Sequence, residues 1–196
     1  MRKMPCVFQR DFTNPRRPVL LRDVTPGCEW VLAGEGVPTR KWDGTAAMAR
    51  GGKIYARIDC KAGRAPPPGS IPCDPQPDPV TGHWPHWIEA TRPGDTWIRT
   101  AAGQLLLPGG VPRWPDGTYE AVGPRINGNA EGLAEHTLVP HGGLYLSDVP
   151  RDFDGLRAWL AGHGCEGVVF RCSDGRMAKI RRDDFGLPWP APEPIG

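Results

Sequence analysis

Lysine is scarce in this chain of 196 residues. The sequence has 5 lysines and 19 arginines, and its formal net charge is only +2. So small a net charge excludes a general polycation, and any nucleic-acid contact must come from a local patch. A guanidinium stays protonated at neutral pH, so it is a poor substitute for an amine nucleophile. Lys41 and Lys179 are therefore of interest, because both fall within the motifs described below.

Long hydrophobic runs are also missing. Residues 1–10 contain no apolar run that could act as a signal peptide, and no stretch approaches the length of a membrane span. We therefore expect a cytoplasmic protein without a membrane partner, and we expect it to be a monomer.

Two common kinds of motif are missing as well. None of the six cysteines forms a Cys-x-x-Cys pair, which argues against a zinc site. Disulfides and free thiols both remain open, and a cytoplasmic setting favours free thiols. No Gly-x-x-x-x-Gly-Lys-Ser/Thr loop occurs, so an ATP site in this chain cannot be a P-loop.

The overall composition is that of a soluble globular protein, with 39% hydrophobic and 23% charged residues. One domain over residues 1–196 is the simplest division of a chain of this length. Short apolar runs at 19–21 and 30–33 are joined by Gly/Pro-rich loops and indicate strands. One clear helix is predicted at 152–164 from apolar residues at helical spacing. Together these features predict an α+β fold.

Two hairpins and one insertion complete the prediction. Residues 45–58 indicate a hairpin that turns at a Gly-Gly pair, which tolerates the positive φ of a tight turn. Residues 64–79 hold seven prolines, cannot form a regular ladder, and are predicted to be an exposed loop inserted into the domain. Residues 167–181 indicate a second hairpin with a turn at Asp174-Gly175.

The second hairpin brings charged residues together. If its turn has two residues, Phe170 lies opposite Lys179 and Val168 lies opposite Arg181. Because side chains alternate faces along a strand, Lys179, Arg181 and Glu166 are then expected to share one side. This grouping predicts a site with two cations and a carboxylate.

The segment Lys41-Trp42-Asp43-Gly44 contains the candidate nucleophile. A lysine amine can attack the α-phosphate of ATP only when it has lost its proton, and an unperturbed lysine has a pKa near ~10.4. Neighbouring cations favour the neutral amine, and Arg40, Lys179 and Arg181 are the candidates. The same cations could hold phosphate oxygens where negative charge develops.

Two carboxylates are candidate metal ligands. Glu120 and Glu166 could bind Mg²⁺ or Mn²⁺, since hard cations prefer carboxylate and phosphate oxygens. Each feature also has an ordinary interpretation: Asp43-Gly44 as a plain turn, Lys179 as the outer face of an edge strand, and the glutamates as surface residues. The sequence blocks around Lys41, Glu120, Glu166 and Lys179, taken together in this order, favour a nucleotide site over those interpretations.

In this order, the blocks around Lys41, Glu120, Glu166 and Lys179 resemble the nucleotidyltransferase motifs of ATP-dependent polynucleotide ligases and capping enzymes. Further segments resemble the ATP-dependent 5′–3′ RNA ligase family that includes the human enzyme. These segments are Gly82-His83-Trp84-Pro85-His86-Trp87, Tyr119-Glu120 with Gly123 and Ile126-Asn127-Gly128-Asn129, Leu138-Val139-Pro140-His141-Gly142, and residues 166–175 continuing through Lys179, Gly186-Leu187 and Trp189-Pro190.

The resemblance implies a nucleotidyltransferase (adenylyltransferase) domain of the ligase, ATP-grasp-like type, with an antiparallel sheet and no appended OB barrel. It implies that ATP and Mg²⁺ or Mn²⁺ act with Lys41 to form lysyl-AMP. AMP then passes to a 5′-phosphate RNA end, and a 3′-hydroxyl displaces AMP to seal the strand. Arg57 and Glu120 would contact the AMP ribose or the RNA end, Glu166 would assist metal binding, and Lys179 with Arg181 would hold the α-phosphate.

The chain departs from the family pattern at the base-binding positions. Related ligases often carry a glutamate just before the nucleophile, whereas this chain has Thr39-Arg40, and its nearest acid is Glu35. Leu144 and Tyr145 are the candidates for stacking on adenine, and Tyr145 is the better stacker.

Several RNA contacts and other functions also follow from the sequence. Arg16-Arg17, Arg181-Arg182, Trp84 and Trp87 are candidates for phosphate and base contact, with core packing as the alternative for the tryptophans. The competing functions are a catalytically silent RNA-binding module, a DNA ligase or capping-type nucleotidyltransferase, and an enzyme that adenylylates a protein or small molecule.

Overall fold

The computed structural model describes residues 4–14, 18–79 and 81–191, and it divides them into two compact units. The central unit is residues 43–141, and the terminal unit combines residues 4–42 with residues 142–191. Arg16 and Arg17 lie outside the described residues. That residues 1–196 act as one adenylyltransferase domain stays a prediction.

Both units mix helices with mostly antiparallel strands, which confirms the α+β class. The α-helices are α1 (Glu29–Leu32), α2 (Thr96–Ala102) and α3 (Phe153–Gly162), and 3-10 turns span Pro93–Asp95, Asn127–Asn129 and Asp183–Phe185. The strands are β1 (Phe8–Asp11), β2 (Val19–Val24), β3 (Val37–Lys41), β4 (Thr45–Arg50), β5 (Lys53–Cys60), β6 (Ile71–Pro72), β7 (Trp84–Glu89), β8 (Gly117–Val122), β9 (Thr137–Pro140), β10 (Gly167–Arg171) and β11 (Met177–Arg181). None of the helices among the described residues is long and apolar enough to cross a bilayer.

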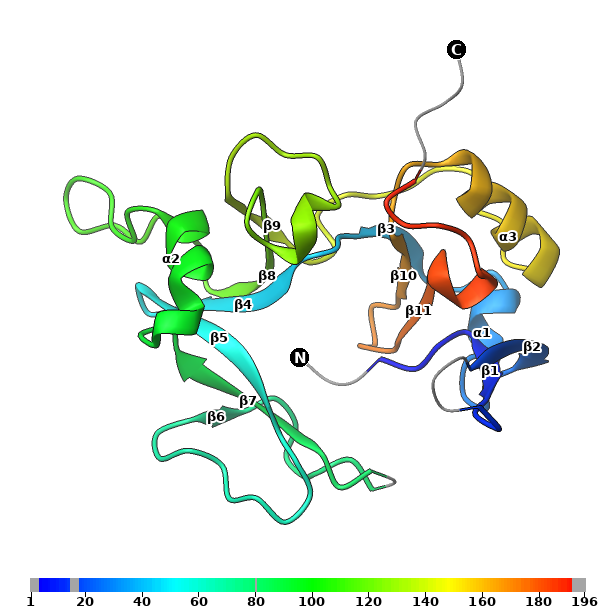
Figure 1. Cartoon of the computed structure of the whole chain (residues 1–196), viewed down its shortest axis with the longest axis horizontal. Coiled ribbons are helices and arrows are strands. Elements are labelled where there is room, and N and C mark those ends of the chain that lie inside the picture. Colours follow the sequence, from blue (N-terminus) through cyan, green and yellow to red (C-terminus); the bar gives the residue numbers. More distant parts are fainter. Residues whose placement is uncertain (1–3, 15–17, 80, 192–196) are drawn as a thin grey trace. The chain divides into compact units, whose positions relative to one another are not determined.

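The central unit is built on a six-stranded antiparallel sheet in the order β6-β7-β5-β4-β8-β9 (Figure 1). Its β4–β5 hairpin confirms the prediction for residues 45–58. Arg50 pairs with Lys53, and the two residues between them, Gly51 and Gly52, have φ of 57° and 72°. Two consecutive positive φ angles match the turn that suits the twist of a hairpin, and glycine adopts them without steric cost.

One face of this sheet is buried under helix α2. Ala47 of β4 and Ala121 of β8 are fully buried, and they share a core with Ile98 and Ala102 of α2. Small side chains on the strands allow the helix to approach the sheet closely. Because strand residues alternate between faces, the opposite face is left to carry the polar residues of β5 and β8.

The proline-rich segment is mostly loop, as predicted, but the prediction that it forms no ladder is wrong at Ile71 and Pro72. These two residues form β6 and pair with Trp87 and His86 of β7. The strand is two residues long and lies at the sheet edge, the place where proline is tolerated. Beside it, Ser70 Oγ is hydrogen-bonded to His86 Nδ1 at 2.9 Å, and burial lowers the pKa of His86.

The terminal unit holds a three-stranded sheet in the order β11-β10-β3 and the separate β1–β2 hairpin. Helix α3 confirms the prediction at 152–164, and Asp152 caps it by accepting a hydrogen bond from the Gly155 amide at 2.9 Å. Leu156 and Leu160 are fully buried and share one core with Phe170 of β10 and Ile180 of β11. One face of the sheet is thus closed by apolar packing, and the other face carries the charged residues.

The apolar run at 30–33 is not a strand, and α1 occupies Glu29–Leu32 instead. Trp30 and Val31 are adjacent and both buried, a pattern that alternation in a half-exposed strand cannot produce. The Glu29 carboxylate accepts a hydrogen bond from the Gly27 amide at 2.9 Å and steadies the turn before the helix. The run at 19–21 does belong to a strand, β2.

Candidate functional site

Lys41 is the last residue of β3, and its position in the sheet defines the site of the terminal unit. The register pairs Lys41 with Gly167 on β10, and Gly167 with Arg181 on β11. Residues directly opposite one another share a face, so Lys41 and Arg181 lie on the same face with a glycine between them. A Cβ on Gly167 would lie 2.3 Å from the Ile180 carbonyl oxygen and 2.9 Å from Arg181 Cα.

The predicted register of the β10–β11 hairpin is wrong by one residue. Val169, and not Phe170, lies opposite Lys179, and Gly167, and not Val168, lies opposite Arg181. The reason is the loop, which has three residues instead of two. The Cys172 amide bonds to the Arg176 carbonyl at 2.9 Å, and Gly175 ends the loop with φ of 89°. A type I turn followed by a left-handed glycine is the usual form of a three-residue hairpin.

Lys179 lies on the same face as Arg181, two residues away along β11. Its backbone is held on the other side by the N-terminal segment, because its amide donates to the Pro5 carbonyl at 2.9 Å. Burial lowers the pKa of Lys179 to about 8, and the charges of Lys41, Arg181 and Arg10 act in the same direction. An anion bound beside Lys179 would offset both the burial of its charge and the repulsion from these cations.

Arg40 does not belong to this cluster, although its sequence position next to Lys41 predicted that it would. It pairs with Val168, so alternation turns its side chain to the opposite face from Lys41. There its guanidinium lies 4.3 Å from the ring centroid of Trp42, a cation–π contact.

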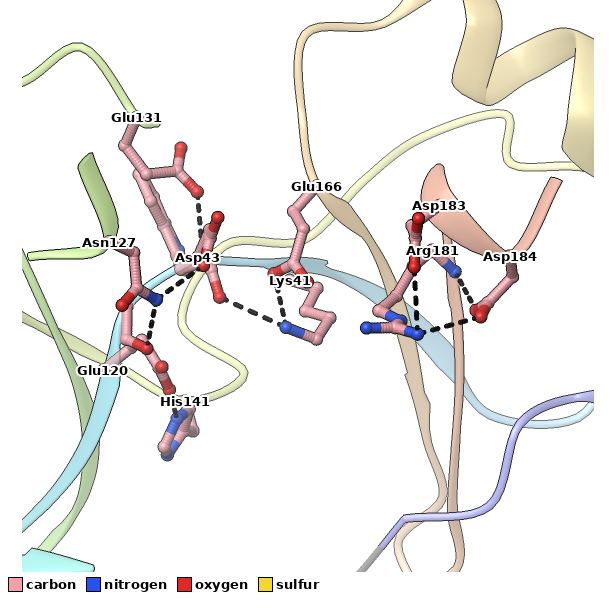
Figure 2. Close-up of polar contacts among 12 residues, drawn as sticks. Lys41, Asp43, Glu120, Asn127, Glu131, His141, Glu166, Arg181, Asp183 and Asp184 are labelled. Carbon is pink, nitrogen blue, oxygen red and sulfur yellow. Dashed lines mark hydrogen bonds and ion pairs between the residues drawn. The ribbon is translucent and has the colours of Figure 1, made fainter. Parts of the chain in front are cut away.

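Glu166 completes the group predicted from the sequence. The Lys41 amine donates a hydrogen bond to Glu166 Oε2 and approaches the Trp42 carbonyl at 3.4 Å (Figure 2). The side chains of Lys41 and Glu166 are only 21% and 12% exposed, so this ion pair is shielded from water. Lys41, Glu166, Lys179 and Arg181 are therefore all brought together in the terminal unit.

Asp184 and Arg10 also belong to this cluster, and sequence reasoning missed both. Asp184, with a side chain 2% exposed, accepts hydrogen bonds from Arg181 Nη2 at 3.0 Å and from Arg10 Nη2 at 2.5 Å. In Figure 2 the Arg181 guanidinium lies between the Lys41 amine and the Asp184 carboxylate. The available signal was the acid three residues after Arg181. Arg10 left none, because β1 is far away in the sequence.

Tyr145 lies at the outer edge of β3, where it forms an antiparallel bridge with Thr39. Thr39 is two residues from Lys41, so the bridge places Tyr145 on the same face as Lys41. Tyr145 is 69% exposed and Leu144 is 45% exposed, so both are open to a ligand. Glu35, the nearest acid before the nucleophile, is paired with Arg176 at 2.5 Å.

The Asp43-Gly44 part of the motif belongs to the central unit and is more than a plain turn. Asp43 Oδ1 accepts a hydrogen bond from Asn127 Nδ2 at 2.8 Å, and the same amide donates to the Gly44 carbonyl at 2.9 Å (Figure 2). A Cβ on Gly44 would lie 2.2 Å from the Ala121 carbonyl oxygen, so only glycine fits against β8. Asn127 itself has a positive φ of 46°, which asparagine tolerates.

Glu120 and Arg57 occupy the polar face of the central sheet. Glu120 pairs with Ala46 of β4, and extending the β4–β5 register by one residue places Arg57 on the other side of Ala46. Glu120 Oε2 is 2.7 Å from His141 Nε2, and both side chains are nearly buried, at 13% and 12% exposed. His141 was not among the predicted site residues, although its place just after β9 puts it within reach of β8.

The described side chains offer few donors for a metal ion. No group of three or more His, Cys, Asp or Glu side chains is arranged to hold a metal among residues 4–14, 18–79 and 81–191. A magnesium ion at a nucleotide commonly uses one or two carboxylates together with substrate phosphates, and does not need a protein cage. Glu166, a shielded carboxylate beside Lys41 and Arg181, has the donor chemistry for that role within the terminal unit.

Two of the predicted RNA contacts are excluded by burial. Arg182 is 2% exposed and donates to the carbonyls of Pro188 and His163, both at 2.8 Å, and to that of Leu160. Trp87 is 3% exposed and packs in the sheet. Trp84 is partly exposed, and its indole nitrogen donates to the Asp74 carbonyl at 2.9 Å. The hydrogen bonds of Arg182 and Trp84 and the packing of Trp87 are thus contacts within the protein.

Residues 111–195 match the family model described as RNA ligase 1. The chain is 39% identical to RNA ligase 1 of Pongo abelii over 87 residues, which cover 39% of this chain and 26% of that protein. It is 38% identical to RNA ligase 1 of Danio rerio over 84 residues, which cover 37% of this chain and 25% of that protein. The resemblance to RNA ligases noted in the sequence is thereby confirmed, over about a quarter of the length of those relatives.

The matched residues include Glu120, Glu166, Lys179 and Arg181, whereas Lys41 and Arg57 precede them. The sheet register is therefore the evidence that connects Lys41 to the matched part. It places the nucleophile candidate one strand from β10 and two strands from β11.

Proposed function

We propose that this chain is an ATP-dependent RNA ligase that joins 5′-phosphate and 3′-hydroxyl RNA ends through lysyl-AMP and RNA-adenylate intermediates. The observation that carries the proposal is the cluster of Lys41, Glu166, Lys179 and Arg181 around one sheet face. The similarity of residues 111–195 to RNA ligase 1 supplies the substrate class. We extend the nucleotidyltransferase type of fold, in the ligase form, to residues 1–196 as part of the same proposal.

In the first step the Lys41 amine attacks the α-phosphate of ATP. The new P–N bond forms as the bond to the β-phosphate oxygen breaks, and pyrophosphate leaves with the electron pair. Nζ must lose a proton, and Glu166 Oε2, already its hydrogen-bond partner, is placed to accept it. Lys179 and Arg181 supply fixed positive charge for the phosphate oxygens, where charge develops.

In the second step the RNA 5′-phosphate takes AMP from Lys41, and in the third a 3′-hydroxyl displaces AMP to close the strand. Glu166 would hold Mg²⁺ or Mn²⁺, which neutralises phosphate charge when bound. Arg57 and Glu120 are proposed to contact the AMP ribose or the RNA end. Glu120 is the second proposed metal ligand, although its carboxylate is already paired with His141.

Tyr145 is the proposed platform for adenine. It is exposed, it shares the face of Lys41, and an aromatic ring gains stacking energy from any base. Stacking does not distinguish adenine from guanine, so Tyr145 alone does not set the nucleotide preference.

The test is covalent capture of AMP. The purified chain is incubated with Mg²⁺ or Mn²⁺ and ATP labelled at the α-phosphate, with GTP in parallel, and then run on a denaturing gel. We expect a labelled band with ATP that is lost in both Lys41→Ala and Lys41→Arg, because neither side chain offers an amine. Lys41→Arg keeps the positive charge beside Glu166, and so it is the control for folding of the site.

The competing functions give different results. A catalytically silent RNA-binding module gives no band with either nucleotide, provided that the intact mass shows unmodified Lys41 at the start. A capping-type enzyme gives a band with GTP. A labelled band without sealing of a broken RNA points to adenylylation of another substrate, and sealing of DNA but not RNA points to a DNA ligase.

A further inference from the structure

A cavity of about 500 Å³ lies within the terminal unit, and Arg181 is part of its wall. The other polar walls come from Arg10 of β1, Arg157 of α3, and the pair Asp183 and Asp184. Arg181 therefore belongs to two places at once: the sheet face of Lys41 and this cavity. The volume is in the range of sites for small ligands.

The cavity has more positive than negative charge. Its three arginines face two aspartates, and the Asp184 carboxylate is shared between Arg10 and Arg181. The Nε atoms of Arg10 and Arg181 are buried and have no hydrogen-bond partner. A guanidinium has five donors, so the protein leaves much of the capacity of these two side chains unused. Arg157 is exposed and adds a third guanidinium.

The remaining walls are apolar. Leu20 of β2, Phe153 of α3 and Phe185 line the cavity, and the rings of Phe153 and Phe185 meet edge to face at 5.1 Å. A free phosphate needs no such wall. A nucleotide does, because its base buries apolar surface while its phosphate binds arginine.

The chemistry of the two AMP transfers indicates which groups a cavity next to Arg181 would bind. Phosphoryl displacements run with the attacking and leaving groups roughly in line. In the first step the β-phosphate of ATP leaves from the side opposite Lys41, and in the second step the RNA 5′-phosphate attacks from that same side. One phosphate subsite on the side of the α-phosphate away from Lys41 therefore serves both groups in turn, and Arg181 is the residue shared by the Lys41 face and the cavity.

We propose that the Arg10–Arg157–Arg181 cavity is this phosphate subsite, which holds the β-phosphate of ATP and afterwards the 5′-phosphate and first nucleoside of the RNA end. The proposal rests on the proposed ligase function. In the transfer to RNA, a 5′-phosphate oxygen forms a phosphoanhydride bond to the AMP phosphorus. The P–N bond breaks, and its electron pair returns to Lys41 Nζ, which takes up a proton from water.

The test variant is Arg157→Ala, because Arg157 is exposed on α3 and is not one of the buried residues of that helix. Arg50→Ala is the matched control, an exposed arginine at the end of β4 and outside the cavity. Both measurements start from the protein that carries lysyl-AMP. The first gives the pyrophosphate concentration at which ATP synthesis reaches half of its maximal rate. The second gives the concentration of 5′-phosphate RNA at which adenylate transfer reaches half of its maximal rate. Loss of one charge-assisted phosphate contact is expected to raise both by about tenfold.

The measurements with pyrophosphate and with RNA distinguish the two sources of phosphate. A rise with pyrophosphate alone assigns the cavity to ATP, and a rise with RNA alone assigns it to the RNA end. No change in either arm relative to Arg50→Ala overturns the subsite. Arg10→Lys is the second variant. It keeps a charge near Asp184 but loses the guanidinium, and it is expected to raise the same two concentrations.

A direct binding measurement separates failure of this subsite from failure of the ligase proposal. Titration calorimetry with inorganic pyrophosphate requires no catalysis. If the wild-type protein shows no labelled band but binds pyrophosphate more tightly than Arg157→Ala, the ligase proposal fails and the subsite stands. If the band forms and Arg157→Ala binds pyrophosphate as the wild type does and keeps both half-maximal concentrations, the subsite fails alone.

Discussion

Lys41 and Arg181 are separated by one residue across the sheet, and that residue is Gly167. The two side chains come from the ends of different strands, 140 positions apart in the numbering, and share one face because both pair with this glycine. A glycine here leaves room between the proposed nucleophile and a proposed phosphate ligand.

Gly167→Ala is expected to disturb this spacing. The added Cβ would meet the Ile180 carbonyl oxygen at 2.3 Å, and backbone cannot yield as a flexible side chain can. We expect a loss of about 1–3 kcal/mol in the free energy of unfolding and a reduced yield of lysyl-AMP. Thermal melting and the labelled band measure the two effects. Gly162→Ala, at a position where a Cβ meets nothing within 4 Å, is the control and should not lower the melting temperature.

Glu166→Gln is expected to slow lysyl-AMP formation on the order of 10²-fold while leaving the fold intact, because the amide keeps the shape but cannot take a proton from Lys41. The rate of labelling at saturating ATP is the measurement. Glu35→Gln removes another carboxylate of the terminal unit, one that pairs with Arg176, and should not change that rate. An equal slowing in both variants would contradict the role of Glu166.

Lys179 predicts a dependence of stability on pH. Its pKa is lowered by burial to about 8 in the folded chain, and it returns towards its ordinary value of 10.5 on unfolding. Between these values the unfolded chain binds more protons, so this lysine makes the free energy of unfolding rise with pH. Below pH 8 both states are protonated, and the folded state bears the full cost of the buried charge.

The measurement is the melting temperature of the wild type minus that of Lys179→Gln, followed from pH 7 to pH 10. Subtraction removes the titration of groups that both proteins share. We expect the difference to become more favourable to the wild type above about pH 8. A difference that stays flat, or that falls, would show that Lys179 keeps an ordinary pKa.

Arg182→Met tests the structural assignment of that arginine. The substitution removes the guanidinium hydrogen bonds to the carbonyls of Leu160, His163 and Pro188, so we expect a loss of about 2–4 kcal/mol in the free energy of unfolding. Chemical denaturation gives this value. At a temperature where the variant is folded, the salt dependence of RNA binding should match that of the wild type, since a buried arginine reaches no phosphate.

The elements that the sequence predicted correctly are those defined by neighbours in the chain. The β4–β5 hairpin follows from Gly51-Gly52, and α3 follows from Asp152 and its apolar spacing. The α+β class follows from the same local signals. The turn signal and the helix signal each act within a few residues, and both agree with the tertiary packing.

The errors come from effects that local patterns do not contain. The register of the β10–β11 hairpin depends on whether its loop has two or three residues, and a one-residue slip changes every cross-strand partner. The helix α1 is set by burial of Trp30 and Val31 in a core made by distant segments. A four-residue helix has too little sequence to show a period.

The residues of the candidate site also divide into those found from local motifs and those placed by tertiary structure. Lys41, Glu166, Lys179 and Arg181 were each found as members of motifs, and the structure brings them together in the terminal unit. Arg10 and Asp184 were missed because each acts through another residue: Asp184 holds two arginines, and Arg10 reaches the site from the separate β1–β2 hairpin. Such supporting contacts depend on tertiary structure: Arg10 left no signal in the sequence, and Asp184 left only its spacing of three residues from Arg181.

The division into two units also sets an order of events during protein synthesis. All six strands of the central sheet are encoded between residues 43 and 141, so this unit can fold once that stretch has left the ribosome. Strand β3 pairs with its main partner later, because β10 is made more than 120 residues after it. Lys41, Glu166, Lys179 and Arg181 therefore come together only after β10 and β11 have been made, and this cluster assembles later than the central sheet.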